Sequence, residues 1–192
     1  VCAMGCRPQS VRKIYCKECP RDELHVDPDV MTTLMAVLKF RCGSVINMNM
    51  CWDAWDSVLP RMELYGEKAT LCIDEEDPDA GPNIFGGDTL VRTKETYRWK
   101  SMPPADSETQ VPWEIAEVRH DYGATSYVTN NRGIGLIDTI RAIRDGRQNR
   151  ACGAMALHLL EVSEGILNSA RDCRYIRMTT TFERPEAMPQ KA

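Results

Sequence analysis

The C-terminal third of the chain constrains the fold most, because its apolar residues follow two helical periods and then a strand period. The spacing predicts a first helix from Ile134 to Asp145, with Gly146 as its C-terminal cap. A second, longer helix is expected from Ala154 to Ala170. The alternation from Tyr175 to Phe182 is typical of a strand. Together they predict helices packed on one face of a β-sheet.

Both helices are expected to be amphipathic, with an apolar stripe toward the sheet and charged residues away from it. The stripe of the first helix comprises Gly133, Leu136, Ile137, Ile140 and Ile143, opposite Asp138, Arg141 and Arg144. The stripe of the second comprises Ala156, Leu159, Ser163, Ile166, Leu167 and Ala170, widened by Met155 and Val162, opposite Glu161, Glu164 and Asn168. His158 lies at the flank of that helix, where we expect it to pack and not to catalyse.

The N-terminal half supplies the strands of the expected sheet. Val30 to Phe40 and Val45 to Trp52 flank a turn at residues 41–44 and predict a hairpin, and Arg61 to Tyr65 and Ala69 to Asp74 predict two further strands. In the second strand Met48 and Met50 alternate with Asn47 and Asn49, so one face is apolar and the other semi-polar. The expected fold class is α+β, a large and mostly antiparallel sheet with helices on one face and the other face open.

Composition limits the functions that fit. The 192 residues are 43% hydrophobic, which predicts one domain over residues 1–192, with 100–112 as a surface loop. A net charge of −4 argues against nucleic acid as a partner. No apolar run approaches the roughly 18 residues of a membrane helix, and no secretory signal begins the chain. A cytoplasmic protein without a membrane partner is expected.

Several blocks, in order, resemble the C-terminal end of the Gfo/Idh/MocA oxidoreductases. The stretch RGIGLIDTIRAIRDGRQNRACGAMALHLLEVSEGILNSARDCRYIRMTTTFERP is similar to the family's Arg-Gly-Ile-Gly-Leu helix, Gly-Arg-x-x-Arg-Ala link, Ala-Leu-His helix and final Glu-Arg-Pro. Upstream, WDAWDSVLPRMELYGEKATLCID and NIFGGDTLVRT resemble the Pro-Arg-x-Glu-x-Tyr-Gly and Phe-Gly-Gly segments. The resemblance covers Val30 to Pro185, whereas the cysteine-rich residues 1–29 match loosely.

The resemblance implies a substrate-binding and assembly domain of an NAD(P)-dependent dehydrogenase acting on a sugar, a polyol or a related compound. In that family NAD or NADP binds to a separate Rossmann domain, so no cofactor site and no catalytic residue are assigned to this chain, which by itself is expected to be inactive. Glu67-Lys68-Ala69 resembles the family's catalytic Glu-Lys-Pro only superficially. It follows Tyr65-Gly66 in a turn between strands, and Lys68 is not given a catalytic role.

Candidate substrate contacts lie at a strand end and in the loop before the first helix. Aromatic faces stack on sugar rings, and amide, carboxylate or guanidinium groups bind hydroxyls. The predicted substrate-binding residues are Trp52, Asp53, Trp55, His120, Tyr122, Asn131 and Arg132. These residues also have structural alternatives. Trp52 could lie in the core, Asp53 and Asn131 could be caps, and Arg132 could pair with an acidic neighbour.

Two other readings remain open. The chain could be a stand-alone dimerisation or sugar-binding module without catalysis. It could also be a small zinc domain, because Cys16 and Cys19 have the spacing of a zinc pair and Cys2 and Cys6 lie nearby. No metal is expected, since the spacing of the first pair is wrong for a zinc knuckle. An open sheet face with Val45, Cys51 and methionines predicts a homo-oligomer, most simply a homodimer.

Overall fold

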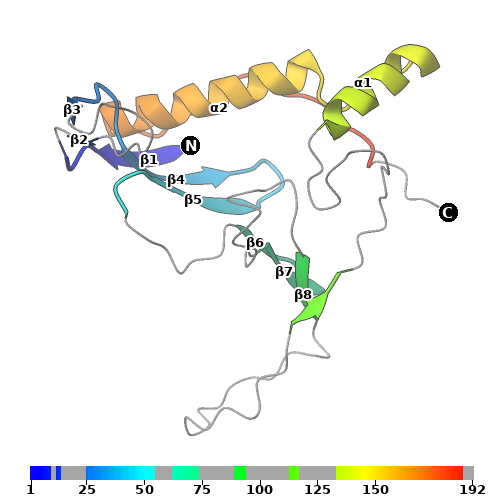
Figure 1. Ribbon diagram of the computed structural model, residues 1–192, viewed down its shortest axis with the longest axis horizontal. Helices are drawn as coiled ribbons and strands as arrows, with labels where there is room; N and C mark the ends of the chain where they lie inside the picture. Colours follow the sequence, from blue (N-terminus) through cyan, green and yellow to red (C-terminus); the bar gives the residue numbers. More distant parts are fainter. Residues whose placement is uncertain are drawn as a thin grey trace, which may run out of the picture. The chain divides into compact units, whose positions relative to one another are not determined.

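A computed structural model describes residues 1–9, 12–13, 25–54, 62–73, 89–93, 113–116 and 133–187 (Figure 1). The chain divides into two compact units. The first contains Val1–Ser57 and Ala151–Pro185, and the second contains Val58–Arg150 and Glu186–Ala192.

The first unit is built on an antiparallel sheet in the order β1-β4-β5, with β1 at Cys2–Cys6, β4 at Thr33–Lys39 and β5 at Val45–Cys51. The predicted hairpin is confirmed, because β4 and β5 pair from Thr33↔Cys51 to Lys39↔Val45. A tight turn joins them, closed by bonds between Phe40 and the backbone of Gly43 and Ser44. Two short strands, β2 (Arg12–Lys13) and β3 (His25–Val26), form a separate antiparallel pair.

Helix α2, Gly153–Asp172, covers one face of this sheet and packs on β1 (Figure 1). The core between them is formed by Val1, Ala3, Ala36, Leu38 and Ile166, with Met48, Met50, Val162, Ala170 and Met178 packed around it. Ser169 is fully buried and joins both layers. Its hydroxyl accepts the Ala3 amide at 2.9 Å and donates to the Arg174 carbonyl at 2.6 Å, so a polar group deep in the core has both its partners.

The helix was predicted with its boundaries within two residues, but its inward face is rotated from the expected one. Gly165, Ile166 and Ser169 are buried, whereas Ala156, Leu159 and Ser163 are exposed. A side chain at Gly165 would meet the Met178 methyl group at 2.6 Å, so the helix needs glycine where the C-terminal segment crosses it. Glu161, expected to face away, is half-buried against that segment.

The predicted strand Tyr175 to Phe182 joins no sheet in the described chain. The burial of its side chains alternates as predicted. The residues between the half-buried positions are exposed, and the half-buried ones are Ile176, Met178, Thr180 and Phe182. Among the described residues, Ile176 alone of this segment exchanges backbone hydrogen bonds with a strand end, giving its amide to Val1 at 2.9 Å and accepting the Val1 amino group at 2.7 Å. The amides of Thr179 and Thr180 bind the Glu161 carboxylate instead, which prevents a ladder.

The face of the β1-β4-β5 sheet opposite α2 is exposed, as the alternation predicted. Met4, Met35, Val37 and Val45 all lie on it and are exposed. Asn47, Asn49 and Cys51 of β5 lie on the same face and are exposed as well. Met48 and Met50 point to the opposite side and pack against the core. One face of this sheet is therefore covered by a helix and the other is open.

The second unit contains an antiparallel sheet in the order β6-β7-β8-β9. Its strands are β6 at Met62–Tyr65, β7 at Ala69–Ile73, β8 at Thr89–Thr93 and β9 at Glu114–Ile115. The Gly66 amide binds the Ala69 carbonyl at 2.9 Å and closes the turn between the first two strands, as the sequence predicted. The Arg92 guanidinium lies 4.3 Å from the centre of the Trp113 ring, a cation–π contact next to β9.

Helix α1 of the second unit spans Ile134–Asp145, the predicted range, and Gly146 caps it in the left-handed conformation at φ 66°. The predicted orientation of its faces was wrong. Leu136, Ile140 and Ile143 are exposed, whereas Asp138 is buried at 4% exposure. Two arginines explain this burial. Arg147 binds the Asp138 carboxylate at 2.7 Å, and Arg150 binds it through its guanidinium and, at 2.9 Å, through its amide.

Within the described residues the coarse fold class is confirmed as α+β, with two helices, but two separate multistranded antiparallel sheets are found in place of the single large sheet that the sequence predicted. In the described part of the chain, neither helix combines the length and apolar character needed to cross a membrane.

Candidate functional site

The candidate site is a cluster where β4 begins and β5 ends, formed by Thr32, Thr33, Cys51, Trp52 and Asp53 and named the strand-end cluster. The register brings the two ends together, because Thr33 pairs with Cys51. One residue beyond, the Trp52 amide donates to the Thr32 carbonyl at 2.9 Å. The hairpin therefore fixes the backbone of Trp52, one of the two predicted substrate contacts that the structure describes.

Asp53 is held by two hydroxyl groups. Its Oδ2 accepts a hydrogen bond from the Thr32 hydroxyl at 2.7 Å and another from the Thr33 hydroxyl at 2.5 Å. Thr32 is buried, and Asp53 itself is half-buried. Two hydroxyl donors on one carboxylate oxygen fix the orientation of the Asp53 side chain at the strand end.

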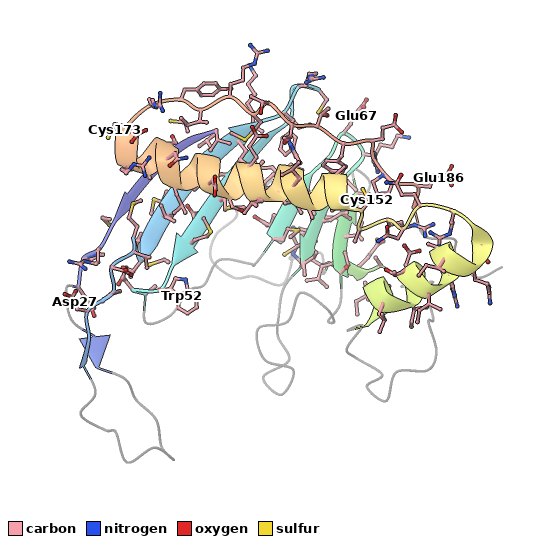
Figure 2. All side chains as sticks on the ribbon, turned by 90° about the horizontal axis from the view of Figure 1, so that it is seen from above. Asp27, Trp52, Glu67, Cys152, Cys173 and Glu186 are labelled. Atoms are coloured by element: carbon pink, nitrogen blue, oxygen red, sulfur yellow. The ribbon has the colours of Figure 1, made fainter. Side chains whose placement is uncertain are left out.

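Trp52 is 80% exposed. The predicted strand ran to Trp52, but β5 ends at Cys51 and the indole leaves the sheet. Figure 2 shows the Trp52 ring beyond the end of β5. A large exposed aromatic face beside a fixed carboxylate is an arrangement that can stack on a sugar ring while the carboxylate binds a hydroxyl.

Cys51 completes the cluster. Its sulfur lies 3.2 Å from the Thr33 hydroxyl oxygen. Because the Thr33 hydroxyl gives its one proton to Asp53, the Cys51 thiol is the donor in this contact.

Sequence reasoning missed Thr32, Thr33 and Cys51 as members of the cluster. The hairpin register could have identified Thr33 and Cys51, because each lies nine residues from Cys42, about which the two strands pair. The bonds from both threonines to one aspartate depend on side-chain orientation at the end of the sheet, which no short pattern encodes. The other predicted substrate contacts lie outside the described residues, namely Trp55, His120, Tyr122, Asn131 and Arg132.

A second polar cluster lies on α2 and is structural in its geometry. The Glu161 carboxylate accepts the amide and hydroxyl of Thr179 at 2.7 and 2.6 Å, and the amide of Thr180 at 2.8 Å. The hydroxyl bonds of Thr179 and Thr180, followed by their backbone bonds, lower the pKa of Glu161 to about 2. His158 binds the Thr180 hydroxyl at 2.8 Å and lies against Phe182, the packing role that was expected.

In the described ranges, no three or more His, Cys, Asp or Glu side chains lie close enough together to hold one metal ion. Cys16 and Cys19, the predicted zinc pair, lie outside those ranges, so the zinc alternative stays untested.

Comparison with known proteins adds no relative. No protein-family model matches the sequence, and neither a curated protein nor a solved structure does.

Proposed function

We propose that this chain is the substrate-contacting and assembly domain of a Gfo/Idh/MocA-type, NAD(P)-dependent oxidoreductase that acts on a sugar, a polyol or a related compound. In this assignment NAD or NADP binds to a different domain, and this chain contributes substrate contacts and a self-association surface. The observation that carries the proposal is the β1-β4-β5 sheet, which has one face covered by α2 and one face exposed. Its antiparallel pairing fits the open-faced sheet that the sequence resemblance implies.

The exposed face supports self-association through its composition. Met4, Met35, Val37 and Val45 place apolar side chains side by side on three neighbouring strands, where a soluble monomer usually carries polar ones. Three strands about 4.8 Å apart, all paired along the five residues of β1 at about 3.3 Å per residue, span a plane of roughly 14 by 17 Å. A standard interface buries about 800 Å² per partner. We therefore expect this face to form the centre of a two-fold interface, with adjoining residues completing it.

The strand-end cluster supports the substrate-contacting role. Trp52 offers an exposed aromatic face, and the neighbouring Asp53 carboxylate already accepts two hydroxyl groups at hydrogen-bonding distance. Sugars and polyols present apolar C–H faces and closely spaced hydroxyls, which match these two side chains. The cluster provides binding groups, and the hydride transfer itself would be the chemistry of the nicotinamide.

Sedimentation velocity tests the assembly role. The wild-type chain is expected to dimerise at micromolar concentration. Met35→Lys places a charge at the centre of the exposed face, where desolvating it in an interface is costly, so the dimer should weaken by more than about tenfold. The matched control is Leu160→Lys, the same charge on the exposed side of α2. A wild-type chain that stays monomeric, or a dimer lost only with Leu160→Lys, contradicts this part of the proposal.

A further inference from the structure

Sulfur is concentrated on the exposed face of the β1-β4-β5 sheet. Nine side chains form a three-by-three array there, named the sulfur array: Cys2, Met4 and Cys6 on β1, Thr33, Met35 and Val37 on β4, and Asn47, Asn49 and Cys51 on β5. Five of these nine carry sulfur. The whole chain has 9 cysteines and 10 methionines in 192 residues, about one in ten, so nine positions would hold about one. The enrichment calls for a chemical explanation.

Met35 is the centre of the array. It pairs directly with Met4 on β1, and Cys2 and Cys6 are its two diagonal neighbours on the same strand. Side chains in direct pairs have Cβ atoms about 4.5–5.5 Å apart, and diagonal neighbours at about 7–8 Å are still within reach of long side chains. The two thioethers and one flanking thiol can therefore approach a common point above the sheet.

These donors are accessible and uncommitted to a disulfide. Met4 is 78% exposed and Met35 is 58% exposed. Cys2, Cys6 and Cys51 are exposed free cysteines. Burial of a methionine in the core would explain its presence without a ligand, but here the core side of β1 and β4 is occupied by Ala3, Ala36 and Leu38 instead.

We propose that the sulfur array binds a soft monovalent metal ion of the Cu(I) class, held by the thioethers of Met4 and Met35 and by one flanking thiolate, from Cys2 or Cys6. Thiolate and thioether ligands select Cu(I), whereas zinc sites use thiolate, imidazole or carboxylate groups. In the described residues no three such groups gather, which disfavours zinc on this face. All donors come from one chain, but they lie on the face proposed above as the dimer interface, so ion binding and dimerisation compete for Met4 and Met35.

Competition for Cu(I) under anaerobic conditions, with bicinchoninate as the coloured competitor, tests the site. The background chain carries Cys16→Ser and Cys19→Ser, because that pair has metal-binding spacing of its own. Met4→Leu with Met35→Leu removes both thioethers at nearly constant volume, and Cys2→Ser with Cys6→Ser removes both thiolates. Controls are Met62→Leu and Cys42→Ser, an exposed thioether and an exposed thiol outside the array.

The background chain is expected to remove Cu(I) from bicinchoninate, with one ion bound per chain. Each double variant of the array should weaken Cu(I) binding by more than about tenfold, while both controls bind like the background. Zn(II) affinity should be the same with and without Met4 and Met35. Unchanged Cu(I) affinity in the methionine variant, or no binding by the background chain, overturns the proposal. Circular dichroism establishes that each variant is folded.

Discussion

Glu161 on α2 holds Thr179 by both its backbone amide and its hydroxyl, at 2.7 and 2.6 Å from the same carboxylate oxygen. The other carboxylate oxygen binds Thr180 in the same way. The Glu161 side chain thus accepts two backbone amides that a neighbouring strand would bind in a sheet, and it attaches residues 179 and 180 to the helix.

Glu161→Gln should release this segment. An amide side chain has only one acceptor oxygen and cannot accept all the donors that the carboxylate binds. We expect a lower melting temperature and faster proteolysis between residues 175 and 182. Glu164→Gln, an exposed glutamate on the same helix, is the matched control and should leave both unchanged. Equal effects of the two substitutions would contradict the structural role of Glu161.

The pH dependence of stability should show the same interaction. The pKa of Glu161 is lowered from 4.5 to about 2 by its threonine partners. A lowered folded-state pKa means that the stabilisation is complete above the ordinary value near 4.5 and is lost as the pH falls toward 2. Wild type should therefore lose more stability over this window than Glu161→Gln does. Parallel pH profiles in chemical denaturation would contradict this assignment.

Asp138 is expected to organise the end of α1. The pKa of its carboxyl is lowered from 3.8 to about 2, first by the Arg147 side chain and then by the Arg150 amide. Arg150 also donates to the carbonyls of Glu186 and Ala187 at 2.8 and 3.1 Å. Asp138→Asn should speed hydrogen exchange at the Arg150 amide and lower the melting temperature. Asp145→Asn, which breaks the exposed pair with Arg144, should change neither.

Ile166 is expected to dominate the packing of α2. It is 4% exposed and lies in the core with Ala36 and Leu38, whereas Leu160 on the same helix is 58% exposed. Ile166→Ala should cost about 2–4 kcal/mol of unfolding free energy, because it removes buried methyl groups and leaves a cavity. Leu160→Ala should stay within about 0.5 kcal/mol. Urea denaturation measures both, and comparable losses would contradict the observed orientation of the helix.

The sequence predicts where the helices and strands lie better than it predicts which residues they contact. The hairpin, the bounds of α1 and the exposed side of β5 follow from periodicity and turn residues, which are local. The burial of Asp138 could not follow from periodicity, since it depends on arginines nine and twelve residues further along. The predicted strand from Tyr175 to Phe182 joins no sheet for a similar reason, because the Glu161 carboxylate accepts amide hydrogen bonds that a neighbouring strand would otherwise accept.

The candidate site was predicted in part. Trp52 and Asp53 were identified by residue type at a strand end, and the structure places both in one cluster. The exposure of Trp52 was not predicted, because alternation was extended one residue past the end of β5. Thr32 and Thr33 were missed since their role depends on how two strand ends meet, which is a property of the folded sheet.

Nuclear magnetic resonance of the indole N–H groups tests the substrate-contacting role most directly. The chain has four tryptophans, and the Trp52 resonance is identified by its loss in Trp52→Phe. We predict that at least one member of a panel of sugars and polyols shifts the Trp52 resonance saturably, that Asp53→Asn weakens this binding, and that NAD and NADP produce no saturable shift. Trp113→Phe should leave binding intact. A panel without any saturable shift at Trp52, or saturable binding of either nucleotide, would contradict the proposed function.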